Sequence, residues 1–178
     1  RVELGISRTF QNIRLFKRMS VLENVKVSTN IHMNYNFFDG IFKTKKYYEQ
    51  EDKSTNEALE ILEVLGLKEY ANEEAQNLPY GKQRKLEIAR ALASKPAILC
   101  LDEPAAGMNP TETDELMETI KIVREKFNTA ILLIEHDMKL VMGICEWIKV
   151  ISFGKEIAQG TPAEIQANEE VIKAYLGE

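Results

Sequence analysis

The 178-residue sequence is poor in cysteine and has no long apolar run. Its 2 cysteines, Cys100 and Cys145, are too few for a disulfide framework, which favours a reducing compartment. No segment approaches the ~18 apolar residues of a membrane-spanning helix. Basic residues are in the minority, with 23 Lys and Arg against 28 Asp and Glu, so there is no broad basic face for phosphates. We therefore expect neither a membrane span nor a nucleic-acid partner.

The second half of the sequence alternates strand and helix patterns. The apolar run 97–101 has the length and composition of a parallel strand that is buried on both faces. Further strands are predicted at 129–134 and 147–153, and helices begin at Asn109, Asp137 and Thr161. Asn109 and Thr161 are each followed by Pro at the first helical position and Glu at the third, which predicts a capped start for both helices. Strands and helices in this order predict crossover connections, and therefore an α/β fold with a parallel sheet.

Helical patterns dominate the first half. Ser20 and Glu23 have the spacing of a capping box, and apolar residues recur at helical spacing over 54–65, before Gly66. A further helix is predicted over 81–93. Its apolar face holds Leu86, Ala89 and Ala93, and its polar face holds Arg84, Lys85 and Glu87. These helices precede the alternating part, which suggests a separate helical lobe.

The segment between Ile31 and Tyr48 is rich in aromatic and basic residues. Its rings are Tyr35, Phe37, Phe38, Phe42, Tyr47 and Tyr48. Aromatic side chains dominate both cores and interfaces. The segment therefore either packs a small helical lobe or docks a partner, and the pattern leaves both interpretations open.

Polar residues follow two of the predicted strands, at the edge where open parallel sheets bind ligands. Asp102 and Glu103 end the first of these strands, and Glu135 and His136 follow the next. One carboxylate can hold a divalent cation while the other faces a water, as phosphoryl transfer requires. Turn formation and helix capping are the alternative roles for these residues. If the two loops share one edge, Asp102, Glu103 and His136 converge.

The segment 78–84 includes the start of the helix predicted over 81–93, and the N-terminus of a helix attracts anions. Gly81 permits a close backbone approach and Lys82 adds a positive charge. The segment can therefore bind a phosphate, although many helices begin in this way without a ligand.

These segments together resemble the motifs of ABC-transporter ATPase subunits, in that family's order and spacing. Residues 78–92 resemble the signature motif, 98–104 the Walker B motif, 8–11 the Q-loop, 106–109 the D-loop and 134–137 the H-loop. The amino-acid sequence is similar to that of the LivG-type ATPase subunit of branched-chain amino acid importers in the segments 8–12, 102–107, 135–142 and 175–178. The resemblance runs from about Gly5 to Gly177.

The resemblance implies a P-loop NTPase-like (RecA-like) parallel sheet flanked by helices, with a helical subdomain, and it implies ATP and Mg²⁺ as ligands. Asp102 would order Mg²⁺, Glu103 would polarise the attacking water, and His136 would touch the γ-phosphate. Gln11 would reach the metal and the water. The turn formed by Tyr80, Gly81, Lys82 and Gln83 would contact the γ-phosphate bound by a second ATPase subunit. Gln11 and Asn109 are further nucleotide-binding residues that the resemblance implies.

The sequence departs from the family pattern at three points. Pro79 stands where a small or hydroxyl residue is usual and has no N–H to donate, and Lys82 puts a charge in place of an amide. Gly-Lys occurs at 81–82 and 154–155, but neither pair is followed by the Ser or Thr of a P-loop. We therefore expect a core that is incomplete at its N-terminus, with the Walker A region upstream of Arg1, and no activity from this chain alone.

The domain organisation implied by the resemblance has three parts. Residues 1–15 form a core remnant with the Q-loop, 16–93 the helical subdomain that ends in the signature helix, and 94–178 the C-terminal half of the core. The implied partners are a second ATPase subunit, identical or not, and membrane permease subunits. The implied location is the cytoplasm, peripheral on the inner face of the cell membrane.

Two other functions remain open at this point. One is the ATPase of a lipid-export ABC system, whose subunits carry similar loops. The other, from a different class, is a non-transport ABC ATPase or a noncatalytic binding fragment. The transported substrate is not encoded in these motifs.

Overall fold

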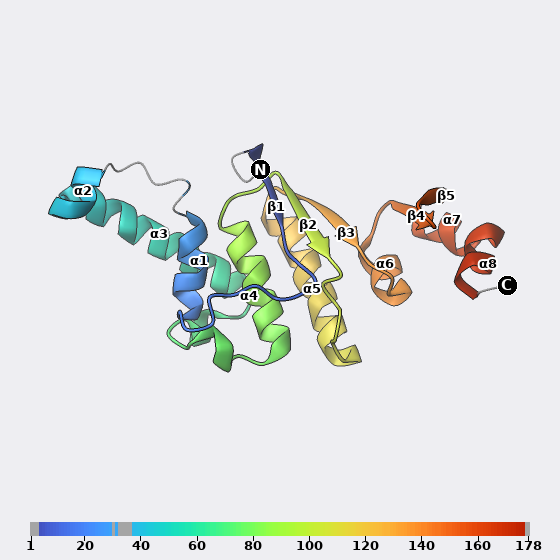
Figure 1. Ribbon diagram of the computed structural model, residues 1–178, viewed down its shortest axis with the longest axis horizontal. Helices are drawn as coiled ribbons and strands as arrows, with labels where there is room; N and C mark the ends of the chain where they lie inside the picture. The colour runs from blue at the N-terminus through green and yellow to red at the C-terminus, as the bar shows by residue number, and fades with distance from the viewer. Residues whose placement is uncertain (1–3, 30, 32–36, 177–178) are drawn as a thin grey trace. The chain divides into compact units, whose positions relative to one another are not determined.

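The computed structural model describes residues 4–29, 31 and 37–176, and the chain divides into two compact units, Arg1–Ile134 and Glu135–Glu178 (Figure 1). We describe each unit by itself. No described helix combines the length and the apolar character needed to cross a membrane. The three-part division at residues 15/16 and 93/94 stays a prediction.

The first unit contains a three-stranded parallel sheet in the order β1-β2-β3. The strands are β1 (Ile6–Arg8), β2 (Ile98–Asp102) and β3 (Ala130–Ile134). Arg8 pairs with Cys100, and Asp102 pairs with Ile134, so the ends of the strands meet at one edge of the sheet. This arrangement confirms the predicted α/β class with parallel strands.

The two faces of this sheet are packed differently. Ser7, Leu99 and Leu101 are buried on one face. Ile98, Leu132 and Ile134 alternate with buried or half-buried residues and are 39%, 55% and 51% exposed on the other face. The prediction that residues 97–101 are buried on both faces is therefore wrong for this unit, because its own helices pack against only one face.

Helices make up most of the first unit. They are α1 (Val21–Thr29), α2 (Phe37–Phe42), α3 (Lys45–Val64), the 3₁₀ turns η3 (Lys68–Tyr70) and η4 (Ala75–Asn77), α4 (Tyr80–Leu92) and α5 (Pro110–Lys126). α5 is the crossover between β2 and β3. The predicted helix over 54–65 is the C-terminal part of the longer α3.

Local signals set the ends of these helices. The backbone N–H of Glu23 donates to Ser20 Oγ at 3.1 Å, and the Glu23 carboxylate accepts from the N–H of Ser20 at 2.8 Å, as the capping pattern predicts. Gly66 has φ +68° directly after the C-cap of α3, a conformation that glycine adopts without strain. Buried hydroxyls then join elements, with Thr29 and Ser54 Oγ atoms 2.6 Å apart between α1 and α3.

The second unit contains α6 (Met138–Ile144), β4 (Ile148–Ser152), β5 (Lys155–Gly160), α7 (Pro162–Gln166) and α8 (Glu169–Leu176). Its core is formed by Ile148, Ile165 and Val171. Thr161 and Glu164 form the predicted capping box at the start of α7.

The strand predicted at 147–153 is present, but its pairing differs from the prediction. β4 pairs antiparallel with β5 rather than extending a parallel sheet. The reason lies in the turn, because Phe153 and Gly154 both have positive φ, +47° and +76°. Two consecutive positive values are typical of the tight hairpin turn that returns a strand along itself.

Candidate functional site

The chain turns sharply where β2 ends. Glu103 has φ +44°, a strained value for a residue with a side chain, and its N–H donates to Ile134 O at 2.9 Å. This turn separates the carboxylates of Asp102 and Glu103, although the residues are adjacent. The two carboxylates have different partners, Arg8 for Asp102 and Gln11 for Glu103.

Glu103 is joined to Gln11. The Gln11 Nε2 donates to Glu103 Oε2 at 2.6 Å, between residues that lie 92 positions apart in the sequence. Gln11 follows β1 and Glu103 follows β2, so the parallel register carries both side chains to the same edge. An amide and a carboxylate at hydrogen-bond distance can together hold and polarise a water molecule.

Asp102 is paired with Arg8. The Arg8 guanidinium lies 2.6 Å from Asp102 Oδ2, and this hydrogen bond, together with the charge of Asp102, raises the pKa of Arg8. The ring of Phe10 lies between two cations, with the guanidinium carbons of Arg8 and Arg14 at 5.7 and 4.4 Å from its centroid. Residues 8–11 therefore contact both carboxylates at the edge of the sheet.

The donor set at this edge fits a magnesium ion that is also held by phosphates. Asp102, Glu103 and Gln11 offer oxygen ligands, which Mg²⁺ prefers, and Mg²⁺ in nucleotide sites uses only one or two protein carboxylates. Among the described residues there is no cluster of three or more His, Cys, Asp or Glu side chains that could form an all-protein metal site. The set therefore suits a shared ion rather than a structural one.

The start of α4 lies against the loop that follows β2. Tyr80 Oη donates to Ala106 O at 2.9 Å. A Cβ on Gly81 would lie 3.3 Å from Glu112 Oε1, so this glycine allows α4 to approach the first turn of α5. Pro79 is the N-cap of α4 and makes no side-chain capping hydrogen bond. The first N–H groups of this 13-residue helix are therefore not capped by the Pro79 side chain.

Lys82 and Gln83 are held by neighbours in the first unit. The Lys82 Nζ donates to the hydroxyl of Tyr70 and lies 3.7 Å from the centroid of its ring. Gln83 Nε2 donates to Leu78 O at 2.8 Å. A role for Lys82 or Gln83 at a phosphate would require each side chain to leave its present partner.

Asn109 is the N-cap of α5. Its Oδ1 accepts from the N–H of Glu112 at 3.0 Å, and the Glu112 carboxylate accepts from the N–H of Asn109 at 3.0 Å. This reciprocal capping was predicted from the sequence. A contact between Asn109 and a nucleotide stays a prediction.

His136 belongs to the second unit, where its side chain is exposed. Its Nδ1 lies 3.8 Å from Glu135 Oε2, and its N–H donates to the same oxygen at 2.9 Å. The convergence of His136 with Asp102 and Glu103 stays a prediction.

The structure corrects the polar face assigned to α4. Arg84 and Glu87 are fully buried, 0% and 1% exposed, and form an ion pair of 2.8 Å. The pair is buried because residues 10–14 cross over this side of the helix, as the bond from Arg14 N to Glu87 Oε1 at 3.2 Å shows. The sequence contains one usable signal, opposite charges at i and i+3 of α4, but it does not reveal what covers them.

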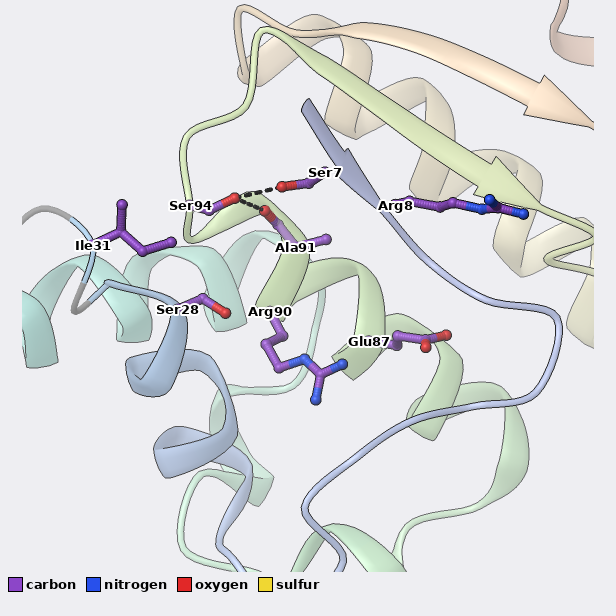
Figure 2. Close-up of a pocket in the computed structure, with 8 residues that line it drawn as sticks. All are labelled: Ser7, Arg8, Ser28, Ile31, Glu87, Arg90, Ala91 and Ser94. Atoms are coloured by element: carbon purple, nitrogen blue, oxygen red, sulfur yellow. Dashed lines mark hydrogen bonds between the residues drawn. The ribbon is translucent and has the colours of Figure 1, made fainter. Parts of the chain in front are cut away.

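A small cavity of about 190 Å³ lies on the other side of the Glu87 backbone, among β1, α1 and α4. Figure 2 shows Ser7 hydrogen-bonded to Ser94 on its wall, and Arg90 and Glu87 directed from α4. Burial lowers the pKa of Arg90, although the charge of Glu87 opposes this. The cavity is below the 300–1,000 Å³ of typical ligand pockets. It contains none of the predicted nucleotide-binding residues.

The aromatic segment is described only in part. Tyr35 and the side chains of Phe37 and Phe38 lie outside the described residues. Ile41, Phe42 and Tyr48 are exposed, at 56%, 73% and 53%. The exposure of these three residues is closer to the docking interpretation than to core packing, and docking itself stays a prediction.

Comparisons with known proteins agree with this geometry. The profile of the family described as ABC transporter matches residues 1–106. The BraF branched-chain amino acid transport ATP-binding protein of Pseudomonas aeruginosa is 52% identical over 174 residues, which are 98% of this chain and 68% of BraF. This chain belongs to the ABC transporter ATPase family. A second profile, described as branched-chain amino acid ATP-binding cassette transporter, matches residues 155–178.

Other members of the ABC family extend the comparison. The LivG protein of Escherichia coli is 50% identical over 175 residues, covering 98% of this chain and 69% of LivG. The lipopolysaccharide export protein LptB of Escherichia coli is 32% identical over 178 residues, covering all of this chain and 68% of LptB. The crystal structure of an ABC-transporter ATP-binding cassette in its ADP conformation superposes with a TM-score of 0.79, at 29% identity, over 99% of this chain and 70% of that one.

Proposed function

We propose that this chain forms part of the ATP-hydrolysing subunit that powers a branched-chain amino acid importer. The observation that carries the proposal is the hydrogen bond of 2.6 Å between Gln11 and Glu103, at the end of a strand that also presents Asp102. Identities of 52% and 50% to BraF and LivG, against 32% to LptB, favour an importer over a lipid exporter.

The residues at the edge of the sheet have separate roles in the proposed hydrolysis. Bound Mg²⁺ supplies charge neutralisation for the phosphates. Asp102, now paired with Arg8, would hold this ion, and Glu103, beside the Gln11 amide, would accept a proton from the attacking water. We assign to His136 a hydrogen bond to the γ-phosphate.

In the proposed mechanism the start of α4 binds the ATP of the second subunit rather than the ATP at the edge of its own sheet. Tyr80, Gly81, Lys82, Gln83 and Asn109 contact the ATP bound by a second ATPase subunit, with the two subunits joined head to tail. The absence of a side-chain cap at Pro79 supports this role, because the uncapped end of a helix favours an anion. When the two subunits join on ATP, Lys82 leaves Tyr70 and places its positive charge beside the phosphates.

The proposed partners are this second subunit and the membrane permease. The complex lies on the cytoplasmic face of the membrane. The test is ATPase activity after reconstitution with candidate permeases: stimulation by an amino acid permease supports the importer, and stimulation by a lipid-export permease alone would contradict it.

The catalytic part of the proposal is tested in the native protein assembled with its transporter partners. Glu103→Gln is expected to abolish ATP turnover and leave ATP binding within about twofold, because the amide keeps the shape and loses the base. Glu118→Gln is the matched control, since Glu118 pairs with Lys121 on the exposed side of α5. Unchanged hydrolysis by the Glu103 variant would remove this residue from its role.

The 178 residues alone are proposed to be inactive. They contain no Gly-x-x-x-x-Gly-Lys-Ser/Thr segment, which cradles phosphates in ATPases of this type. Calorimetric titration of this polypeptide with MgATP is expected to give weak binding. Tight binding would show that the remaining loops hold the nucleotide without that cradle.

A further inference from the structure

We propose that Arg84 is a positioning residue that fixes the backbone of Phe10 and Gln11, and thereby holds the Gln11 amide against Glu103. This inference rests on the proposed function. Among the described residues, Arg84 forms its side-chain hydrogen bonds with Phe10, Gln11 and Glu87, and none with Glu103. It acts through the loop that carries Gln11.

The contacts of Arg84 are directed at main-chain oxygens. Its Nη1 donates to Phe10 O and its Nη2 donates to Gln11 O, both at 2.7 Å. Both bonds span more than 70 positions of sequence, 74 and 73. A guanidinium presents several donors in one rigid plane, so it can fix two successive carbonyls at once. The orientation of the peptide that leads to Gln11 is therefore set by α4.

Glu87 completes the clamp. Its Oε2 accepts from Arg84 Nη1 at 2.8 Å, and its Oε1 accepts from the N–H of Arg14 at 3.2 Å. The loop is therefore held at residues 10, 11 and 14 by two side chains of one helix. The ring of Phe10 beneath the Arg14 guanidinium, 4.4 Å from its centroid, adds a further contact within the loop.

The arrangement is costly, which argues that it does more than fill space. Arg84 is the largest of the fully buried side chains, and its Nε has no hydrogen-bond partner among the described residues. Apolar residues of similar volume in place of a buried ion pair are often neutral or stabilising. A charged pair at this place gives the loop a defined position that apolar packing would not give.

The result at the sheet edge follows from this geometry. The Gln11 side chain reaches Glu103 at 2.6 Å while its own carbonyl is held by Arg84. Loss of one anchor shifts the amide, and a displacement of about 1 Å at a reacting group can reduce a rate by about 100-fold. The affinity for ATP depends on other residues, so we expect it to be unchanged when Arg84 is replaced.

The test uses Arg84→Lys in the native protein assembled with its transporter partners. Lysine keeps the positive charge beside Glu87, but its single ammonium cannot reproduce the planar fork that serves both carbonyls. We expect kcat for ATP hydrolysis to fall at least 10-fold, with KM for ATP within twofold. Amide hydrogen exchange at residues 12–14 is expected to become faster. Lys121→Met is the matched control, since Lys121 lies on α5 outside the assigned motifs and pairs with Glu118 instead.

The outcomes separate the two proposals. Hydrolysis by Arg84→Lys at the control rate, or a rise of KM in parallel with the fall of kcat, overturns the positioning role. If the unmodified protein does not hydrolyse ATP, the proposed function fails, and hydrogen exchange alone then decides the clamp. Unchanged exchange at residues 12–14 refutes the clamp, and faster exchange supports it.

Discussion

Because Arg84 and Glu87 form a buried ion pair, we expect Glu87→Gln to lower the free energy of unfolding of the unmodified protein but to raise that of the Arg84→Met variant. Arg84→Met leaves the Glu87 carboxylate buried with the N–H of Arg14 as its remaining partner in the clamp. Removing one member of a buried ion pair costs about 3–5 kcal/mol. Against a total stability of about 5–15 kcal/mol, this loss is large and measurable.

The second substitution, Glu87→Gln, removes the orphaned charge. In the unmodified protein it leaves the Arg84 cation buried without its counter-ion, at a cost of about 1–3 kcal/mol. In the Arg84→Met background it removes an unpaired charge and is expected to stabilise by about 1–2 kcal/mol. The coupling between the two sites is the difference between these two effects, about 2–5 kcal/mol, which is at or above the upper part of the roughly 0.5–3 kcal/mol seen for contacting residues.

Urea unfolding followed by circular dichroism measures this cycle. With an unfolding slope of about 1–3 kcal/mol per molar urea, the Arg84→Met midpoint is expected to fall by at least about 1 M. The double variant should recover part of that loss. If Glu87→Gln destabilises both backgrounds by the same amount, the two charges do not interact as described.

Two further predictions concern helix ends. Asn109→Ala breaks the capping box of α5 and is expected to cost about 1 kcal/mol; calorimetry should show a midpoint about 2–4 °C lower, with Asn109→Ser close to the parent, and equal midpoints for Ala and Ser would contradict the capping role. In the second unit, hydrogen bonds from the backbone N–H and hydroxyl of Thr161 lower the pKa of Glu164 below its usual 4.5. The stabilisation is therefore present above pH 4.5 and is lost as the pH falls through the lowered value. Glu164→Gln should flatten this acid dependence when unfolding is followed by Trp147 fluorescence, and an unchanged pH profile would show that Glu164 does not contribute.

Much of the secondary structure was predictable because its signals are local. Reciprocal capping at Ser20, Asn109 and Thr161 depends on side chains within three residues of each cap, and all three boxes formed as predicted. The parallel pairing of 98–102 with 130–134 followed from strand length and the intervening helix. The parallel pairing predicted for 147–153 is wrong, because alternation of strands and helices does not reveal that the turn at Phe153 and Gly154 pairs this strand with the one that follows it.

The meeting of Gln11 with Glu103 was expected only through the resemblance, and the structure gives its physical basis. Both residues follow parallel strands, and register alone brings strand ends to one edge. The resemblance assigned no contact to Lys82 within its own chain, whereas the structure places its ammonium on Tyr70.

Local sequence therefore determined the helix caps at Ser20, Asn109 and Thr161 and the family that the chain resembles, since these properties depend on neighbours along the chain. Packing over long distances in the sequence fixed the environment of each charge. Arg84 and Glu87 have the pattern of a solvated helix face, and they are buried because residues 10–14 cross them. A charge at a given position costs or stabilises according to the groups that surround it, and those groups come together only when the chain folds.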